Sequence, residues 1–518
     1  DVEGFVRLAQ RMGLWVILRP APFICAESEF GGLPAWLLRY PDMKVRTNTP
    51  LFLEKLESYY RELFSRIANL QVTEGGPVIM MQVENEYGSF GNEKAYLRAV
   101  KSLMEKYGAK VPLFTADGSW DAALEAGSLV EDGVLATANF GSRSNENLDA
   151  LERFYARHGV KRPLMCMEFW DGWFNRWREP VITRDAQDLA EAVRELLPRA
   201  GINLYMFIGG TNFGFYNGCS ARGNTDLPQI TSYNYDAVLT EWGEPTEKFY
   251  RIRQVIQELY PEIPTFEPRD HKSCAFGPAK LTGKVSLFSC VDELAQPVES
   301  AYPLTMEEAG SGYGYMLYRT KVIGFDNVMK VKAVRASDRV HFYLNGEFQG
   351  VQYQDEVGTE IEMKFGRENV LELLVENMGR VNYGYKLQAP TQSKGIRGGV
   401  MVDIHFESGW EQYPLSLDRV DQLSFQGEWK EGMPGFFRYE FDAAEPADTF
   451  LDCSSLGKGV AFINGFHLGR YWSEGPVCYL YIPAPLLKAG KNELILFETE
   501  GKLAEELELK DYPVYRQQ

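Results

Sequence analysis

The 518-residue sequence predicts an α/β fold: a (β/α)8 TIM barrel whose first two β/α units are missing from this chain, followed by two all-β, jelly-roll-like sandwich domains. Three observations predict this order. Up to about residue 210, short apolar runs alternate with amphipathic helical segments, which is typical of a parallel sheet covered by helices. After Pro261, short alternating segments with Gly, Asn and Asp turns replace the helical periodicity. Within this second part, one pattern of segments occurs twice.

The strands of the first part are expected to be buried on both faces, because their runs are apolar at almost every position. Gly13 ends the first helical pattern, as glycine often does. The predicted strands are 14–18, 78–83, 111–115, 134–140, 164–167 and 203–208, and the predicted helices are 2–12, 52–70, 93–107, 120–126, 148–158 and 186–200.

Six strands could also form an open, doubly wound sheet. An eight-stranded barrel takes about 250 residues, and the predicted region has 262 with its large loops. An open sheet usually binds its ligand at one switch point, whereas several strand ends here carry polar clusters. This favours the barrel, and without two of its units the barrel is expected to have an open flank.

The second part contains an internal repeat with offsets of 119 to 123 residues. YMLYRT (315–320), VHFYLNG (340–346) and NVLELLVE (369–376) match FFRYEF (436–441), VAFING (460–465) and NELILFE (492–498). Two sandwiches of one type, each with an Asn-Gly hairpin turn, are therefore expected. The predicted domains are 1–262 for the barrel, 263–300 for a linker and strands that pair with the last domain, 301–395 for the first sandwich and 396–518 for the second.

Composition excludes several classes of function. The net charge of −18, from 72 acidic and 54 basic residues, argues against binding to nucleic acid or to an anionic membrane surface. No apolar run approaches the roughly 20 residues that span a bilayer. The seven cysteines are scattered without CxxC pairs, which favours reduced thiols and a cytoplasmic location. The histidines lack metal-ligand spacing and no glycine-rich phosphate loop follows a strand, so neither a metal nor a cofactor is expected. A homo-oligomer stays open as an alternative to a monomer.

Two strand ends carry glutamates that are candidates for catalysis, Glu86 and Glu168. The segments are GGPVIMMQVENEYGSFG (75–91) and RPLMCMEFWDGWFNRW (162–177). The carboxyl ends of parallel strands meet at the edge where α/β folds place their chemistry. Glycoside hydrolysis needs two carboxyls that flank the scissile bond, about 5 Å apart for retention or about 6.5–9.5 Å for inversion. The alternative is that each glutamate forms an ion pair with an arginine such as Arg162 or Arg178.

Neighbouring residues allow structural interpretations as well. Glu84 lies two residues before Glu86, and we expect it to pair with a buried arginine such as Arg19. Tryptophans usually belong to the core. The density of Trp170, Trp173 and Trp177 beside polar residues nevertheless indicates that at least one of these rings stacks on a sugar.

The motifs resemble those of glycoside hydrolase family 35, the β-galactosidases of the retaining (β/α)8 clan. They extend from near residue 5 to near residue 500, so the resemblance covers nearly the whole chain. The similar segments are ICAESEFGGLPAWLL (24–38), 75–91, MEFWDGWF (167–174), LYMFIGGTNFGF (204–215), TSYNYDA (231–237), NMGRVNYG (377–384) and FINGFHLGRYW (462–472).

The resemblance implies roles for single residues. Glu86 would be the acid/base, Glu168 the nucleophile and Asn85 a hydrogen-bonding partner of the sugar 2-hydroxyl. The galactose pocket would further include Cys25, Ala26, Glu27, Tyr205 and Tyr233.

Many relatives carry Tyr where this chain has Trp170, and Asp171 follows in place of Thr. This departure resembles the smaller bacterial branch, which prefers β-1,3-linked galactose. Trp170 and Trp173 would then form an aglycone platform, with Tyr385 reaching over from the first sandwich.

The resemblance implies a retaining exo-β-galactosidase that releases terminal galactose from an oligosaccharide or glycan through a galactosyl–enzyme ester. The expected preference is for β-1,3 linkage to GlcNAc or GalNAc. Another exo-β-glycosidase of the same fold, such as a β-glucosaminidase, is an alternative, and so is a galactose-binding protein without activity. The sandwiches themselves are expected to be structural, because they carry no acidic cluster of their own.

Overall fold

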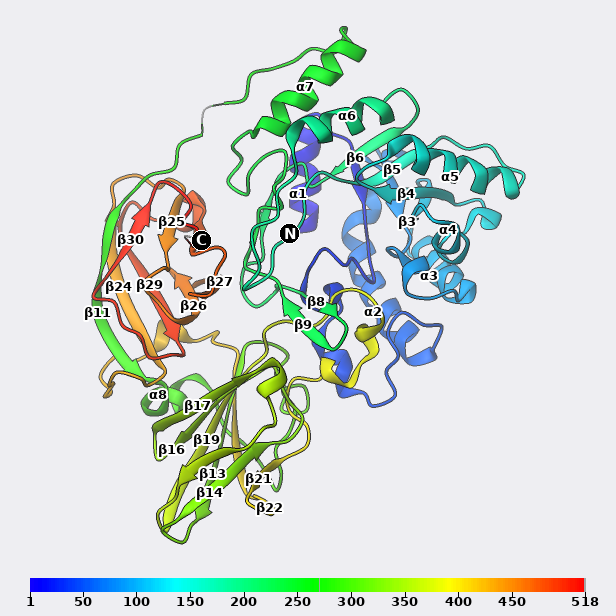
Figure 1. Cartoon of the computed structure of the whole chain (residues 1–518). Coiled ribbons are helices and arrows are strands. Elements are labelled where there is room, and N and C mark those ends of the chain that lie inside the picture. Colours follow the sequence, from blue (N-terminus) through cyan, green and yellow to red (C-terminus); the bar gives the residue numbers. More distant parts are fainter. Residues whose placement is uncertain (270, 517–518) are drawn as a thin grey trace.

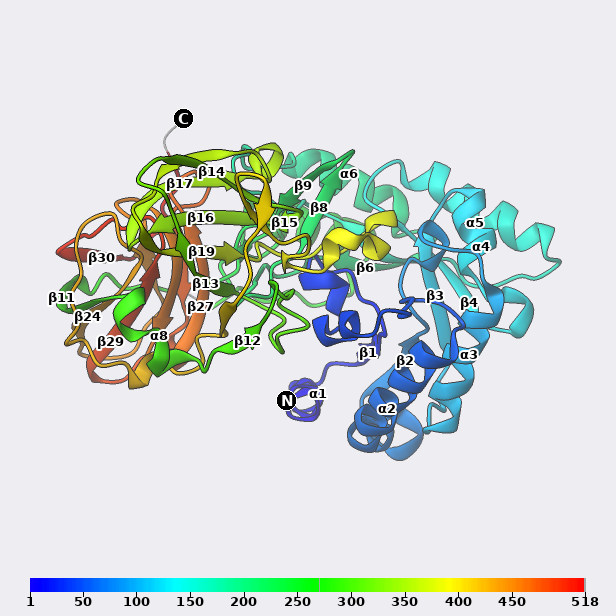
Figure 2. The same cartoon turned by 90° about the horizontal axis from the view of Figure 1, so that it is seen from below.

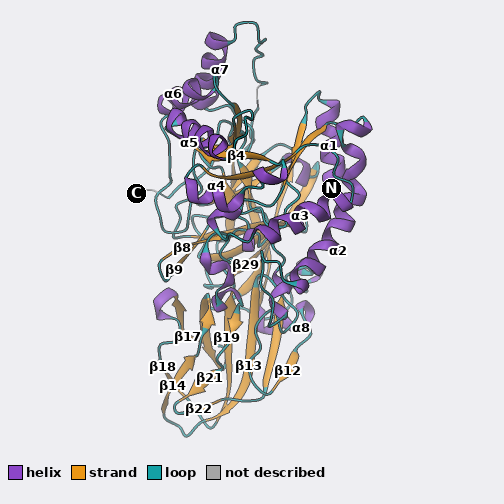
Figure 3. Cartoon of the chain, turned by 90° about the vertical axis from the view of Figure 1, so that its right-hand side faces the viewer, coloured by secondary structure: helices purple, strands orange, loops and turns teal. Residues whose placement is uncertain are grey.

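The computed structural model describes residues 1–269 and 271–516 in three parts (Figure 1). Residue 270, in the predicted linker, and residues 517–518, at the end of the predicted last domain, lie outside the described residues. Figure 3 shows the helices gathered on the first part of the chain, whereas the other two parts consist mostly of strands. This confirms the predicted change of fold class along the sequence.

The first part is a TIM-like domain built on an incomplete, curled sheet of six parallel strands in the order β1-β2-β3-β4-β5-β6. Helices lie along the outside of this sheet (Figure 2). The strands are β1 (Val16–Leu18), β2 (Val78–Gln82), β3 (Leu113–Gly118), β4 (Leu135–Phe140), β5 (Met165–Trp170) and β6 (Gly201–Tyr205). The helices are α1 (Val2–Arg11), α2 (Pro50–Ile67), α3 (Lys94–Lys106), α4 (Asp121–Gly127), α5 (Ser144–Arg157), α6 (Ala186–Leu196) and α7 (Glu247–Leu259).

Each predicted strand and helix of this domain has a counterpart within a few residues. Helix α7 was not predicted, and neither were two short strand pairs in the long loop between β6 and α7. These pairs are β7 (Gly210–Thr211) with β10 (Ser232–Tyr233), and β8 (Cys219–Arg222) with β9 (Thr225–Pro228). Within the described ranges, none of the helices combines the length and apolar character that crossing a membrane requires.

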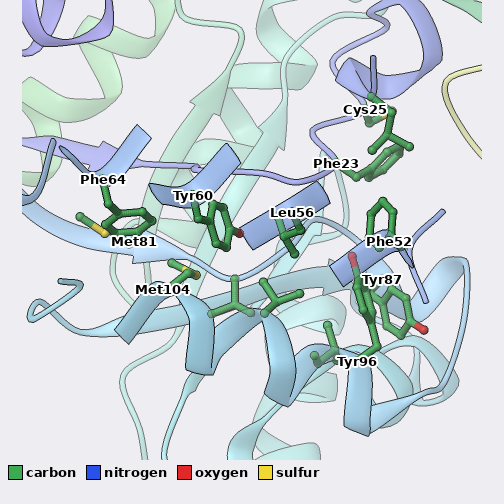
Figure 4. Close-up of a cluster of buried hydrophobic side chains, with 14 of the residues drawn as sticks. Phe23, Cys25, Phe52, Leu56, Tyr60, Phe64, Met81, Tyr87, Tyr96 and Met104 are labelled. Carbon is green, nitrogen blue, oxygen red and sulfur yellow. The ribbon is translucent and has the colours of Figure 1, made fainter. Parts of the chain in front are cut away.

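Helix α2 shows why these segments fold as they do. It starts with Pro50 directly after Thr49, and proline fits the first helical position because its missing N–H would have no partner there. Four of its five buried residues recur every four positions, which places these four on one side of the helix. They are Phe52, Leu56, Tyr60 and Phe64. Figure 4 shows this side facing Met81 of β2 together with Tyr96 and Met104 of α3.

The two β-domains share an order of strands. In the first, a six-stranded sheet β12-β23-β13-β19-β16-β17 faces a four-stranded sheet β18-β14-β21-β22, and the second is an eight-stranded sheet β27-β26-β29-β24-β11-β30-β25-β28. The run β13-β19-β16-β17 has the same order as β24-β29-β26-β27, as the repeat predicts. Both hairpins turn on left-handed Asn-Gly pairs, at 345–346 and 464–465.

The bounds of these strands are as follows. The first β-domain has β12 (Val298–Ser300), β13 (Tyr315–Ile323), β14 (Val328–Ala333), β16 (Arg339–Leu344), β17 (Glu347–Tyr353), β18 (Ile361–Lys364), β19 (Glu368–Glu376), β21 (Val400–Val402), β22 (His405–Phe406) and β23 (Trp410–Leu415). The second has β11 (Gly277–Ser286), β24 (Gly435–Ala443), β25 (Thr449–Asp452), β26 (Lys458–Ile463), β27 (Phe466–Trp472), β28 (Tyr479–Ile482), β29 (Gly490–Glu498) and β30 (Glu506–Lys510).

Two predicted domain limits need correction. The limit at residue 395 falls inside the first β-domain, because β21 pairs with β14 and β23 pairs with β13. The segment 263–300 divides between the two domains: β11 pairs with β24 and β30, whereas β12 pairs with β23. Strand pairing decides membership of a sheet, and local alternation of side chains does not show which partner a strand takes.

Buried ion pairs join all three parts at one junction. Glu376, at the end of β19, accepts hydrogen bonds from Lys458 Nζ at 2.6 Å and Arg470 Nη1 at 2.8 Å, both from the last domain. Arg470 Nε also donates to Asn217 Oδ1 of the first domain at 2.8 Å. This junction fixes the start of the segment 377–384, which continues from β19 towards the carboxyl edge of the parallel sheet.

Candidate active site

A cavity of about 300 Å³ opens at the carboxyl edge of the parallel sheet. This volume lies at the lower end of the range that small-molecule sites occupy. The lining residues come from strand ends, from the loops that follow them and from the segment 377–384. They are Cys25, Ala26, Glu27, Glu86, Trp120, Glu168, Trp170, Trp173, Phe174, Arg176, Tyr205, Ser220, Ala221, Tyr235, Asn382 and Tyr383.

Glu168 of β5 is buried and held through both carboxylate oxygens. One oxygen pairs with the guanidinium of Arg19, which directly follows β1, and the other accepts a hydrogen bond from Trp170 Nε1 at 3.2 Å. Arg19 also donates to the side-chain oxygen of Asn85. Asn85 therefore contacts Glu168 only through Arg19, and it helps to orient Glu168 by holding this arginine. The arginine that Glu168 contacts is thus Arg19, and not Arg162 or Arg178, which were named as examples in the alternative interpretation.

Glu86 follows β2 in a left-handed backbone conformation, with φ of 45°. Its N–H donates to the carbonyl of Ala116 at 3.0 Å, and its carboxyl accepts a hydrogen bond from Asn139 Nδ2 at 3.0 Å. Burial, together with the like charge of Glu168, raises the pKa of Glu86 to about 8. The raised pKa favours the protonated form of Glu86 at neutral pH, and its carboxyl lines the same cavity as that of Glu168.

Asn139 of β4 links the two glutamates. Asn139 lies opposite Glu168 in the pairing of β4 with β5. Its side-chain amide donates a hydrogen bond to the Glu86 carboxyl. The geometry therefore places both carboxyls beside one cavity and gives them unlike neighbours: an arginine for Glu168 and an amide for Glu86.

The turn Cys25-Ala26-Glu27 has three consecutive residues with left-handed φ angles of 56°, 48° and 45°. Such strained backbone is concentrated at functional sites in proteins. Glu27 accepts a hydrogen bond from the Tyr233 hydroxyl, and the hydroxyls of Tyr233 and Tyr205 lie 3.0 Å apart. Burial raises the pKa of Glu27 to about 7. This chain of polar groups forms one wall of the cavity.

The structure brings most of the predicted site residues together. Those that line the cavity are Cys25, Ala26, Glu27, Glu86, Glu168, Trp170, Trp173 and Tyr205. Asn85 and Tyr233 lie behind this wall in contact with Arg19 and Glu27. Tyr385 does not join them: its side chain is 74% exposed and its hydroxyl donates to the carbonyl of Gly223.

Tyr383 and Asn382 occupy the place that the sequence analysis assigned to Tyr385. Asn382 is buried, where its Oδ1 accepts from the Cys219 N–H at 3.0 Å and its Nδ2 donates to Cys25 Sγ at 3.3 Å. This anchoring turns Tyr383 into the cavity wall before the chain reaches the 3-10 helix that begins at Tyr385. The motif showed that this segment reaches the site, but not which tyrosine faces inward.

Several lining and supporting residues were missed or assigned wrongly. Arg19 was expected to pair with Glu84, but Glu84 forms a buried pair with Arg46, with both N–O distances at 2.8 Å. Arg19 follows a predicted strand directly, so the strand-end rule that found Glu86 could have found it too. Asn139 also lies near the end of a predicted strand, whereas Trp120 was assigned to the start of the predicted helix 120–126. For Asn382 the only signal was the motif 377–384 that contains it, which does not show which of its side chains reaches the site.

Metal ligation finds no support in the described ranges 1–269 and 271–516. No group of three or more His, Cys, Asp or Glu side chains is arranged there to hold a metal ion. The chemistry that this cavity offers is that of two carboxyls, one protonated and one beside an arginine.

Three family profiles match the chain. Residues 1–259 match the one described as "Glycosyl hydrolases family 35". Residues 303–416 match "Beta-galactosidase, first all-beta domain", and residues 434–492 match "Beta-galactosidase, galactose-binding domain".

Similar proteins come from distant organisms. "Beta-galactosidase-1-like protein 2" of Homo sapiens is 37% identical over 515 residues, covering 96% of this chain and 78% of that protein. "Beta-galactosidase" of Xanthomonas manihotis is 36% identical over 490 residues, covering 93% of this chain and 79% of that protein. Among solved structures, a β-glucuronidase of Bacteroides uniformis covers 90% of this chain and is itself covered to 57%, at 11% identity and a TM-score of 0.27.

Proposed function

The chain belongs to glycosyl hydrolases family 35, and on that premise we propose that Glu86 and Glu168 carry out a retaining exo-β-galactosidase reaction. The protein is a glycoside hydrolase, a β-galactosidase, and its substrate is a galactosyl carbohydrate. The observation that carries the assignment of roles is the contrast between the two carboxyls. Glu86 is protonated at neutral pH, with its pKa raised to about 8, while Glu168 contacts the Arg19 guanidinium.

The first half-reaction forms a bond to the enzyme. The Glu168 carboxylate attacks the anomeric carbon of the terminal galactose, and the bond from that carbon to the leaving oxygen breaks. Glu86 gives its proton to this oxygen, so the aglycone departs as a neutral alcohol. The product is a galactosyl–enzyme ester on Glu168.

The second half-reaction reverses these roles. Glu86, now a carboxylate, takes a proton from water, and the water oxygen attacks the anomeric carbon as the ester bond to Glu168 breaks. Two inversions at the same carbon release galactose with retained β configuration. Glu86 ends the cycle protonated and Glu168 ends it ionised, so no cofactor takes part.

The remaining predicted residues have supporting roles in this proposal. Asn85 accepts a hydrogen bond from Arg19, and in this proposal it also hydrogen-bonds the sugar 2-hydroxyl. Glu27, with the hydroxyls of Tyr205 and Tyr233, supplies hydrogen-bonding groups for the galactose hydroxyls. Cys25 and Ala26 complete this wall at the left-handed turn.

A trapping experiment tests the reaction and the nucleophile together. A 2-deoxy-2-fluoro-β-galactosyl fluoride should inactivate the enzyme and leave a single adduct on the peptide that carries Glu168. Hydrolysis of aryl β-galactosides without any adduct would point to inversion. A faster reaction with another aryl glycoside, such as a β-glucosaminide, would show that the enzyme prefers a sugar other than galactose.

The linkage preference is a separate proposal. Trp170 and Trp173 line the cavity with their rings edge to face at 5.6 Å, which offers an aromatic surface to the sugar that follows galactose. We assign Tyr383, in place of Tyr385, to the same aglycone site, and we propose a preference for β-1,3 linkage to GlcNAc or GalNAc, as in the smaller bacterial branch of the family. The support is Trp170 itself, where many relatives carry Tyr.

Kinetics of Trp173→Ala test this site. The variant should lose more kcat/KM on Gal-β-1,3-GlcNAc than on an aryl β-galactoside, because only the disaccharide places a sugar on the ring. An unchanged ratio would remove Trp173 from the aglycone site, and equal rates of the parent enzyme on the β-1,3 and β-1,4 disaccharides would refute the linkage preference.

A further inference from the structure

A second cavity, of about 480 Å³, adjoins the active-site cavity. Trp120, Trp170 and Trp173 line both cavities, so these three rings form their common boundary. We propose that the second cavity is a subsite for the second sugar of the aglycone. The preferred substrates are then neutral chains of at least three sugars, counting the terminal galactose. This inference rests on the proposed function, because it assumes that galactose occupies the first cavity.

The sizes of the two cavities support this division. The first cavity, with about 300 Å³, is the smaller of the two and contains both glutamates, so it is assigned to the terminal galactose. A glycan whose first aglycone sugar lies against Trp170 and Trp173 therefore has to continue past these rings. The second cavity begins on their other side and is larger than the first.

Trp120 is the natural stacking surface of the second cavity. It follows β3, and 53% of its side chain is exposed. A side chain at Gly118 would overlap the Trp120 ring, so the ring lies directly on the backbone of the last residue of β3. The benzo ring of Trp120 is thereby held against the strand, and this contact reduces the conformational entropy that the side chain loses when a sugar packs on it.

The opposite wall is preformed as well. Asn147 of α5 donates through Nδ2 to the carbonyls of Ser142 and Arg143, at 2.8 and 3.0 Å, and its Oδ1 accepts from the Ser119 hydroxyl. These bonds connect the loops after β3 and β4 on the two sides of the cavity. A wall that is built before the ligand arrives is typical of binding sites for small molecules.

The charges on this wall suit neutral sugars. Arg184 lies against Asp188 at 2.9 Å, so these two lining residues balance each other. Arg143 is exposed and lies 3.7 Å from Glu146, a separation that leaves its N–H groups free for hydroxyl oxygens. The exposed hydroxyl of Ser142 adds a donor and acceptor for the same purpose. Hydroxyl-rich hexoses or N-acetylhexosamines match these groups.

Substrate length tests the inference directly. The substrates are Gal-β-1,3-GlcNAc and Gal-β-1,3-GlcNAc-β-1,3-Gal, with the corresponding pair that starts with a β-1,4 linkage run in parallel. We expect kcat/KM to be about tenfold higher for the trisaccharide, the size of one aromatic stacking contact. The gain should appear in KM, because the added sugar lies far from the reacting carbon.

Two tryptophan variants locate the effect. In Trp120→Ala the ratio of trisaccharide to disaccharide kcat/KM should fall to near one, and because the ratio is taken within one variant, a general loss of activity cancels. Trp36→Ala is the matched control, since Trp36 is 45% exposed and lies outside both cavities. Its ratio should equal that of the parent enzyme.

A second measurement needs no variant and covers the case in which Trp120→Ala fails to fold. With an aryl β-galactoside as donor, GlcNAc-β-1,3-Gal should capture the galactosyl–enzyme ester about tenfold better than GlcNAc does. Equal rates for both substrate lengths, together with equal capture by both acceptors, would overturn the subsite while leaving the proposed function intact. If neither aryl galactosides nor disaccharides are hydrolysed, the proposed function itself fails and the subsite falls with it.

Discussion

At the scale of single residues, the site depends on keeping two nearby glutamates in opposite protonation states. Burial does most to raise the pKa of Glu86, and the like charge of Glu168 adds to it. The Arg19 guanidinium compensates the charge of Glu168 and cannot lose its own proton at any working pH. The acid and the nucleophile are therefore distinguished by their neighbours rather than by their residue type.

Glu86→Gln should separate substrates by their leaving groups. Glutamine cannot donate a proton as glutamic acid does, so we expect hydrolysis of disaccharides to fall by about 10²–10⁴-fold. The formation of the ester from an activated aryl galactoside should be largely spared, because such a phenolate leaves without a proton. Stopped-flow release of the phenol measures this step, and equal losses on both substrates would contradict the acid role of Glu86.

The pH profile should show the raised pKa of Glu86. Since kcat/KM reports the free enzyme, its alkaline limb for a disaccharide should lie near pH 8, where Glu86 loses its proton. The hydrogen bond from Asn139 favours the ionised form, so Asn139→Leu should shift this limb to higher pH. A limb that stays in place or moves to lower pH would remove Asn139 from this role.

The same shift has a consequence for stability. The pKa of Glu86 rises from 4.5 in the unfolded chain to about 8 in the folded one. The unfolded chain therefore releases this proton first, and the contribution of Glu86 to folding becomes less favourable as pH rises from about 4.5 through about 8. In Glu86→Gln this part of the pH dependence of the melting temperature should disappear.

At the scale of elements, the end of β2 is held by a buried ion pair. Arg46, from the loop before α2, reaches Glu84 with two N–O distances of 2.8 Å and also donates to the carbonyl of Asn85 at 2.7 Å. Glu84 and Glu86 both have left-handed φ angles. The pair thus fixes the irregular backbone that turns Glu86 towards the cavity.

Arg46→Met should destabilise the first domain by about 3–5 kcal/mol, because it leaves the Glu84 carboxylate buried without its counter-ion. Two measurements detect the effect: the midpoint of thermal unfolding of this domain, and the rate of amide hydrogen exchange in β2. Arg66→Met is the matched control, since the pair of Arg66 with Glu62 is exposed to solvent and should contribute nothing measurable. Equal effects of the two substitutions would show that burial does not matter here.

At the scale of the whole molecule, the cavity is completed by a domain that lies far along the chain. Arg380 pairs with Glu29 of the first domain and with Glu307 of the first β-domain, and all three side chains are buried. This contact, with the junction at Glu376, fixes the segment that carries Asn382 and Tyr383. The first β-domain is therefore part of the site, contrary to the expectation that both sandwiches are purely structural.

The first domain also has an exposed apolar flank. β1 and β6 are the outer strands of the described sheet, and α1 beside β1 exposes Phe5 to 71% and Met12 to 70%. Trp15, between α1 and β1, is 67% exposed. Apolar side chains gathered in this way mark a surface that associates with other surfaces.

We expect the exposed apolar side chains of α1 to cause self-association. Sedimentation velocity should show oligomers that dissociate in the double variant Phe5→Glu/Met12→Lys, because charge on this face opposes apolar contact. Phe325→Glu is the control, since Phe325 is 75% exposed in the loop between β13 and β14 of the first β-domain. A monomeric parent chain, or the same shift in the control, would contradict this prediction.

The sequence determined much of this protein through local patterns. Apolar runs and helical periodicity located every strand of the six-stranded sheet and all of its helices except α7, because burial on one or both faces leaves a periodic trace. Glu86 and Glu168 could be predicted for the same reason: each lies at the end of such a run, and all parallel strands end at one edge. The internal repeat predicted two similar β-domains through the Asn-Gly turns and the strands around them.

Only the tertiary structure decided which residues meet. It paired Glu84 with Arg46 and Glu168 with Arg19, turned Tyr383 instead of Tyr385 into the cavity, and assigned β23 to the first β-domain. It also joined the two cavities at Trp120, Trp170 and Trp173. Periodicity shows which face of a segment is buried. The contacts between segments depend on their register and docking, and segments that lie hundreds of residues apart leave no local pattern that shows how they pair.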